Sequence, residues 1–265
     1  MADEKLSHLK EQVYRDHRPK EHFDRFHERA RTREPDYVYE LVRCITTIWG
    51  YLAFRTRGIG ADNVPVSGRV ILAPNHFSFM DHFLVGMFIR RRIRFMAKSQ
   101  LFSPPMQWVY THGGVFPVRR GARDEEAFVT AELILGREGC MAMYPEAGRS
   151  RTGKLAERAK PGIGRLALTT GTPVVPVAIF GSHKVRNWKK LQFPKVTVQY
   201  GEPMTFPLEA DPSRERQQEV ADEIFARIQE LHAGLEQHGR KGIAQRVREQ
   251  QRALRRAKRR RTAPA

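Results

Sequence analysis

A histidine and an aspartate five positions apart, His76 and Asp81, are the residues of this chain best suited to chemistry. A neutral imidazole can take a proton from a hydroxyl near pH 7, and a carboxylate on its other nitrogen fixes the tautomer and stabilises the imidazolium that results. Acyl transfer to an alcohol needs such a base. Within one helix the two residues would lie about 140° apart and would not share a face. The spacing therefore predicts His76 on a loop after a strand and Asp81 in the first turn of the next helix.

Downstream segments add groups that could hold a phosphate or an acyl donor. One of them, residues 113–120, consists of a glycine turn and a short strand, and it ends with Arg119 and Arg120. A guanidinium fork can make two parallel charge-assisted hydrogen bonds to a phosphate. Another, 140–150, is a buried-strand pattern that runs into a polar loop, and open α/β sheets carry function at the carboxyl ends of their strands. The candidate substrate-binding residues are Arg119, Glu146, Gly148, Arg149, Ser150 and Lys160.

This ordered set resembles the glycerolipid acyltransferase family, in particular the bacterial 1-acyl-sn-glycerol-3-phosphate (lysophosphatidate) acyltransferases, from about residue 55 to about residue 205. His76 and Asp81 match the family's Asn-His-x4-Asp block, and the resemblance implies that they are the general base and its orienting partner. The other blocks match at Gly113, Phe116 and Arg119, at Tyr144-Pro145-Glu146 and Arg149-Ser150, and at Val175-Pro176-Val177.

The resemblance also implies a reaction. An O-acyltransferase of this kind moves a fatty acyl group from a thioester to the free hydroxyl of 1-acyl-glycerol 3-phosphate, which gives phosphatidic acid in phospholipid synthesis. Arg119 and Arg149 are expected to hold the phosphate of the acceptor, and Glu146 to position Arg149 or the glycerol. Acyl-CoA or an acyl carrier protein supplies the thioester as co-substrate, and no metal or other cofactor is expected.

Two departures from the family pattern leave the acceptor open. Ala147-Gly148 stands where Gly-Thr is usual, and Pro117-Val118 stands where Ile-Asp is common. If a glycine at position 147 supplied a left-handed backbone, Ala147 must manage without it. Glycerol 3-phosphate, another lysophospholipid or a glycolipid therefore remain alternative acceptors. A non-catalytic basic protein that binds membranes or nucleic acid is a less favoured alternative, in which His76 and Asp81 would be dispensable.

Positive charge is concentrated at the end of the chain. The formal net charge is +18, and residues 240–261 alone hold eleven Lys/Arg against one acid, Glu249. Such a run attracts a polyanion, but the chain has no recognised nucleic-acid motif and this segment has no aromatic residues to stack on bases. An anionic membrane surface fits better, since each basic residue near it contributes about 1 kcal/mol. An acidic carrier protein or the phosphates of coenzyme A are further candidate partners, and a solvated tail without a partner stays open.

The elements that must position these residues alternate along the chain. The pattern predicts a single α/β domain whose mixed, mostly parallel sheet is flanked by helices. Strands are expected at 69–74, 93–97, 115–118, 140–144, 173–180 and 194–200, and helices at 79–90, 123–137 and 161–170. A long helix is expected to open at Asp211-Pro212, with the aspartate as its cap.

Apolar residues at three- and four-residue spacing predict an amphipathic helix over 36–56, which either packs on the core or lies in a membrane interface.

No signal peptide or membrane span is expected, and Cys44 and Cys140 are read as reduced, packed thiols. We therefore expect a cytoplasmic protein, peripheral on the inner face of the cell membrane. The expected organisation is a charged N-terminal extension at 1–34, the amphipathic helix at 35–58, the acyltransferase domain at 59–239 and a polybasic tail at 240–265.

Overall fold

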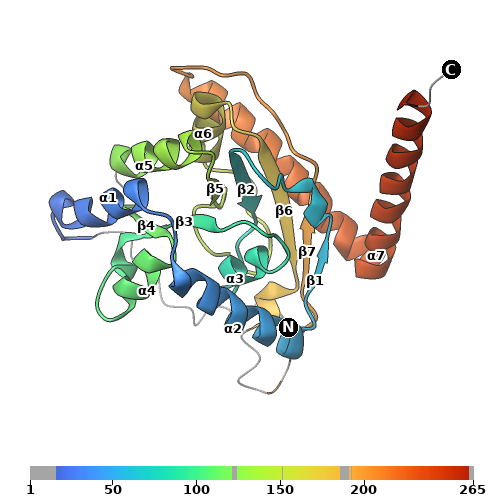
Figure 1. The fold of residues 1–265 in the computed structure, drawn as a ribbon, viewed down its shortest axis with the longest axis horizontal. Helices are drawn as coiled ribbons and strands as arrows, with labels where there is room; N and C mark the ends of the chain where they lie inside the picture. Colours follow the sequence, from blue (N-terminus) through green and yellow to red (C-terminus); the bar gives the residue numbers. More distant parts are fainter. Residues whose placement is uncertain (1–15, 121–123, 151, 186–190, 192, 263–265) are drawn as a thin grey trace.

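A seven-stranded sheet lies at the centre of the computed structural model, and helices cover both of its faces (Figure 1). The structure describes residues 16–120, 124–150, 152–185, 191 and 193–262, with side chains as far as residue 253. The strand order is β1-β7-β6-β2-β5-β3-β4, and every neighbouring pair is parallel except β6 and β7. The strands are β1 Arg57–Ile59, β2 Val70–Pro74, β3 Ile93–Lys98, β4 Val115–Val118, β5 Cys140–Ala142, β6 Val174–Phe180 and β7 Thr197–Tyr200. The predicted mixed, mostly parallel α/β fold is confirmed.

The helices form two layers. α2 and α3 pack on one face of the sheet, and α5, α6 and the first part of α7 pack on the other. The helices are α1 Asp24–Thr32, α2 Tyr37–Phe54, α3 Asp81–Gly86, α4 Met106–His112, α5 Glu125–Gly136, α6 Gly162–Thr170 and α7 Arg214–Thr262, with short 3-10 turns at Lys20–Phe23, Ala61–Asn63 and Ser99–Leu101. None of the helices in the described part of the chain is long and apolar enough to cross a membrane.

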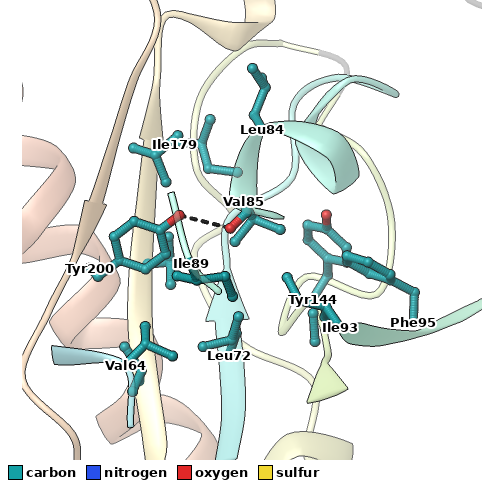
Figure 2. Close-up of a cluster of buried hydrophobic side chains, with 14 of the residues drawn as sticks. Val64, Leu72, Leu84, Val85, Ile89, Ile93, Phe95, Tyr144, Ile179 and Tyr200 are labelled. Carbon is teal, nitrogen blue, oxygen red and sulfur yellow. Dashed lines mark hydrogen bonds between the residues drawn. The ribbon is translucent and has the colours of Figure 1, made fainter. Parts of the chain in front are cut away.

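The central strand β2 is buried along its whole length because both of its faces are covered. Its alternate side chains divide between the layers, with Leu72 facing α2 and α3 and Ile71 facing α5 to α7. Figure 2 shows the cluster on the α3 side, where the Tyr200 hydroxyl donates to the carbonyl oxygen of Val85 at 2.7 Å. This bond ties α3 to the sheet and thereby fixes the helix that begins with Asp81.

Several predicted boundaries are wrong. The helix expected at 79–90 is shorter, because the backbone of residues 77–80 turns around the Asp81 carboxylate before the helix begins. The long helix begins at Arg214 rather than at Asp211, and its cap is Ser213, whose Oγ accepts the Arg216 N–H at 3.2 Å. The stretch after Pro104-Pro105, where no helix was expected, forms α4, with Pro105 as its N-cap. Strand β1 was not predicted.

The N-terminal residues that the structure describes belong to the same body. Phe23, Phe26 and Ala30 are buried, and α1 packs against α5 and β4. The guanidinium of Arg94, itself buried, donates to the carbonyl oxygens of Ala30 and Arg33. Residues 1–15 of the predicted extension lie outside the described residues.

The last helix, α7, is broken at Gly239, whose backbone (φ 60°, ψ 170°) is not helical. The first part packs closely on α6 at Gly164. A Cβ at this position would lie 1.9 Å from the carbonyl oxygen of Gln217, so only glycine allows this close approach. The second part is anchored by Ile243 and Ala244 and then leaves the body (Figure 1).

The prediction of packed thiols holds for buried Cys140 and is wrong for Cys44, which is exposed on α2; both are free.

Candidate active site

The order of the central strands brings the candidate site residues together. Because β2, β5, β3 and β4 are parallel neighbours in that order, their carboxyl ends meet at one edge of the sheet. His76 follows β2, Tyr144 follows β5, Lys98 ends β3 and Arg119 follows β4. The four residues therefore lie along one edge, although they come from four separate segments of the sequence.

Asn75 fixes the loop that carries His76. Its Nδ2 donates to the carbonyl oxygen of Ile179 at 3.1 Å, and its Oδ1 accepts the N–H of the same residue at 2.6 Å. The side chain thus continues the pairing of β2 with β6 for one more residue. This holds the chain at the sheet edge just before the histidine.

His76 and Asp81 form a buried pair, placed as their spacing predicted. Nδ1 of His76 lies 2.9 Å from Oδ2 of Asp81, and that oxygen also accepts the backbone N–H groups of Phe77 and Ser78, each at 2.7 Å. The carboxylate lies in the first turn of α3, where the helix dipole favours negative charge. Because Asp81 is on Nδ1, that nitrogen carries the proton and Nε2 is left to accept one.

The surroundings keep His76 neutral at pH 7. Burial lowers the pKa of His76 below 6.5, the Asp81 carboxylate opposes that shift, and the positive charges of Arg149 and Arg120 add to it. The Tyr144 ring stacks on the imidazole with centroids 4.1 Å apart, and His82 stands edge-on at 5.1 Å. A neutral, oriented imidazole is the form that a general base requires.

Glu146 joins two loops around the base. Its Oε2 accepts the backbone N–H of His76 at 2.6 Å, and its Oε1 accepts that of Ala156 at 3.1 Å. The Ser150 N–H donates in turn to the carbonyl oxygen of His76 at 2.8 Å. Burial raises the pKa of Glu146 to about 7, although both N–H bonds oppose the shift. The geometry supports a role in holding the His76 loop; the predicted role in substrate binding stays a prediction.

The loop that follows Tyr144 keeps the left-handed backbone that the family pattern suggested. Ala147 adopts φ 52°, so the alanine accepts the strained conformation that glycine would adopt freely, at a cost of about 1 kcal/mol. Gly148 follows it without a positive φ. Ser150 Oγ donates to the carbonyl oxygen of Lys154 at 2.6 Å. Lys160 contributes its backbone, whose N–H donates to the carbonyl oxygen of Pro145 at 2.9 Å, while its side chain is exposed.

Lys98, Arg120 and Arg149 lie close enough to influence one another's charge near the base. Burial lowers the pKa of Lys98, and the nearby charges of Arg149 and Arg120 lower it further. Arg119, of the arginine pair, is a residue predicted from the sequence, whereas Lys98 was not predicted. The backbone N–H of Arg119 donates to Asp124 at 2.6 Å. Lys98 could have been found from its place at the carboxyl end of a predicted strand. Three positive groups close together suit a dianionic phosphate.

An apolar cavity of about 270 Å³ adjoins the base. His82 lines the cavity and also contacts the His76 ring, so this residue connects the cavity to the base. Most of the other lining residues come from α2, α3, α4 and the strands β3 and β4; among them are Val42, Phe79, Phe83, Phe95, Val109 and Val115. The cavity can accommodate hydrocarbon. Within the described residues, no group of three or more His, Cys, Asp or Glu side chains could hold a metal ion.

The chain is similar to known proteins. A family model described as Acyltransferase matches residues 55–180. A chloroplastic 1-acyl-sn-glycerol-3-phosphate acyltransferase, BAT2 of Brassica napus, is 28% identical over 149 residues, which cover 53% of this chain and 43% of that protein. The 1-acyl-sn-glycerol-3-phosphate acyltransferase of Borreliella burgdorferi is 28% identical over 127 residues, 47% of this chain and 50% of that protein. The chain thus spans half or less of the length of these relatives.

Two further similarities extend the comparison. A glycerol-3-phosphate acyltransferase of Alteromonas mediterranea is 26% identical over 172 residues, which cover 54% of this chain and 20% of that protein. The crystal structure of the 1-acyl-sn-glycerophosphate (LPA) acyltransferase PlsC from Thermotoga maritima matches with a TM-score of 0.56 at 24% identity, over 78% of this chain and 87% of that one. This second likeness shows the fold.

Proposed function

The chain belongs to the glycerolipid acyltransferase family, and from that premise we propose that it moves a fatty acyl group from a thioester to the free hydroxyl of 1-acyl-glycerol 3-phosphate. The observation that carries the proposal is the buried His76–Asp81 pair, which His82 connects to an apolar cavity and which feels the positive charges of Arg120 and Arg149. Phosphatidic acid and a free thiol are the products. The proposed place of action is the inner face of the cell membrane.

His76 acts as the general base. Its Nε2 takes the proton of the acceptor hydroxyl as the oxygen attacks the thioester carbonyl, and the sulfur leaves with its bonding electrons. The proton then passes from the imidazolium to the thiolate. Asp81 holds the tautomer and stabilises the imidazolium between these steps. A positioned base of this kind is typically worth about 10² to 10⁴ in rate.

The cations and the cavity divide the substrates between them. Lys98, Arg119, Arg120 and Arg149 are proposed to bind the phosphate of the acceptor, so that its free hydroxyl reaches His76. The cavity takes the acyl chain, because its lining is almost entirely apolar. The thioester of coenzyme A or of a carrier protein is a co-substrate, and this scheme uses no other cofactor.

The exposed side of α2 supports a membrane location. Large apolar side chains along this helix face solvent, namely Leu41, Ile45, Ile48, Trp49 and Leu52. Exposed apolar area on this scale is typical of a helix that lies in a membrane interface. α2 also lines the cavity, so a helix in the interface would bring the site to a lysophospholipid.

The test is thiol release from a long-chain acyl-CoA, with and without 1-acyl-glycerol 3-phosphate, by the wild type, His76→Ala and His238→Ala. Release that requires the acceptor, and that His76→Ala alone abolishes, is expected, together with phosphatidic acid as product. His238→Ala controls for the loss of a histidine on α7. Equal release by the wild type and His76→Ala would refute the assigned base.

Glycerol 3-phosphate is a second candidate acceptor. The similarity to a glycerol-3-phosphate acyltransferase and the Ala147-Gly148 departure favour it. The same assay with this acceptor decides between the two. A higher kcat/KM for glycerol 3-phosphate than for the lysophosphatidate would establish the smaller acceptor.

A further inference from the structure

The imidazole of His76 is packed against aromatic rings as well as held by Asp81. The planes of the His76 and Tyr144 rings are inclined by 27°, with centroids 4.1 Å apart, so Tyr144 covers a face of the imidazole. The His82 ring stands at 89° to His76 and at 62° to Tyr144, 5.1 Å from each. The base is thus bounded by a carboxylate at Nδ1, by the stacked Tyr144 ring and by the nearly perpendicular His82 ring.

The fold fixes Tyr144 in this position. The residue follows β5, the strand beside β2, and its carbonyl oxygen accepts the Ala147 N–H at 3.0 Å. Figure 2 shows its ring beside Ile93 and Phe95 of β3. The hydroxyl is buried and has no hydrogen-bond partner among the described residues. The ring rather than the hydroxyl is therefore what contacts the base.

An aromatic face suits the charge that develops on His76. When the imidazole takes the acceptor's proton it becomes a cation, and a cation over a ring face is attracted by the ring quadrupole. Burial lowers the pKa of His82 to about 4, so this neighbour stays neutral and adds no repulsion. Arg149 and Arg120 do oppose a positive charge on His76, and Asp81 favours it. A face contact therefore acts in the same direction as Asp81.

We propose that Tyr144 is a positioning residue that holds the His76 imidazole by its face and stabilises the positive charge that this ring carries during the reaction. The second part rests on the proposed acyl transfer, whereas the first part does not. Tyr144 acts through its contact with the His76 ring.

Substitutions that keep the shape of the ring test the proposal. Phenylalanine, 4-fluorophenylalanine and 3,4,5-trifluorophenylalanine at position 144 withdraw electron density from the ring face step by step while they change its size little. We expect kcat to fall along the series, by roughly 3- to 30-fold in total, with the KM values of both substrates unchanged. The His76 pKa, followed by NMR of labelled histidine, should fall in the same order, because the imidazolium loses its stabilisation.

The matched control carries the two fluorinated phenylalanines at Phe225, which is buried on the opposite face of the sheet. There the His76 pKa and kcat should stay constant. If fluorination at position 144 changed neither kcat nor the His76 pKa, the proposal would be overturned and Tyr144 would be a packing residue.

The NMR titration needs no substrate, which separates the two hypotheses. If the wild type released no thiol with any donor or acceptor, the proposed function would fail. A His76 pKa that still followed fluorination at position 144 would support the stack on its own. An unchanged pKa would refute the stabilisation of the imidazolium by Tyr144 even in an active enzyme.

Discussion

At the scale of single residues, the His76–Asp81 pair determines how activity depends on pH. Because burial holds the pKa of His76 below 6.5, the imidazole stays deprotonated down to that lower pKa. We expect kcat/KM to be level near pH 7 and to fall about tenfold per pH unit below the His76 pKa. Asp81→Asn removes the charge that raises this pKa, so the acid limb should move to still lower pH while kcat drops. A profile of kcat/KM from about pH 4.5 to 8 measures both effects.

Glu146 supplies the control for that profile, since its pKa of about 7 also lies in the measured range. Glu146→Gln should lower kcat, because one of the two backbone N–H groups loses its acceptor, but it should keep the acid limb. If the limb disappeared in Glu146→Gln and survived in Asp81→Asn without a shift, the titrating group would be Glu146 and the base would be wrongly assigned.

Lys98 is expected to bind the acceptor's phosphate. Lys98→Ala should raise the KM for the lysophosphatidate acceptor by about 10- to 100-fold, the equivalent of one charge-assisted hydrogen bond, and leave the KM for the thioester unchanged. Lys98→Arg should retain most of the affinity, and Lys154→Ala, on the neighbouring loop, should behave like the wild type. A drop in kcat at constant KM would instead assign Lys98 to the chemical step.

The sequence identified part of this site and missed the rest for a physical reason. The relation between His76 and Asp81 is local, so their spacing was enough to predict a loop and a first helical turn. Lys98 and Tyr144 reach the site only because β5 lies between β2 and β3. Strand order is a long-range property that residue types do not encode in their sequence positions. Lys98 stands at the end of a predicted strand and Tyr144 lies in a matched sequence block, but their closeness to His76 follows only from the strand order.

At the scale of elements, the strands were predictable and some helices were not. Strands β2, β3 and β4 agree with the prediction to within one residue at each end, because they are short, apolar and buried. α3 was predicted too long, because the bonds that Asp81 makes to the preceding backbone are not visible as an apolar pattern. For the helix at 36–56, the sequence left core packing and membrane contact open. The structure shows that its apolar side is largely exposed.

That exposure predicts a phenotype for α2. Ile45→Ser combined with Trp49→Ser should weaken binding to phospholipid vesicles by about tenfold or more, since each apolar side chain loses much of its transfer free energy. The melting temperature should change little, because the two side chains are 58% and 44% exposed. Vesicle sedimentation and thermal unfolding measure the two quantities.

Val66→Ser combined with Leu208→Ser is the matched control, because both of these apolar side chains are exposed and both lie outside α2. Vesicle binding should be unaffected there. If both double variants bound vesicles as the wild type does, α2 would not be the membrane contact.

At the scale of the whole molecule, α2 carries the exposed apolar side chains and the second part of α7 carries much of the positive charge. Only the start of this basic part lies near α2, the proposed membrane contact. Arg240 Nη1 donates to the carbonyl oxygen of Arg55, so the base of the second part of α7 adjoins the end of α2. From there the helix runs away from α2 (Figure 1). The segment from residue 248 to residue 262 spans about 21 Å as helix, more than twice the screening length of about 8 Å at physiological salt.

The proximal charges should therefore matter more for vesicle binding than the distal ones. Replacing Arg240, Lys241, Arg246 and Arg248 with Gln should weaken binding to anionic vesicles and reduce its salt dependence, at about 1 kcal/mol per charge that lies near the surface. Deleting residues 249–265 removes seven Lys/Arg and one Glu, yet it should have the smaller effect. Both variants keep the buried contacts of Ile243 and Ala244, so both should fold. A larger loss on deletion would mean that the distal turns bind the anionic surface themselves, and that the membrane does not lie along α2.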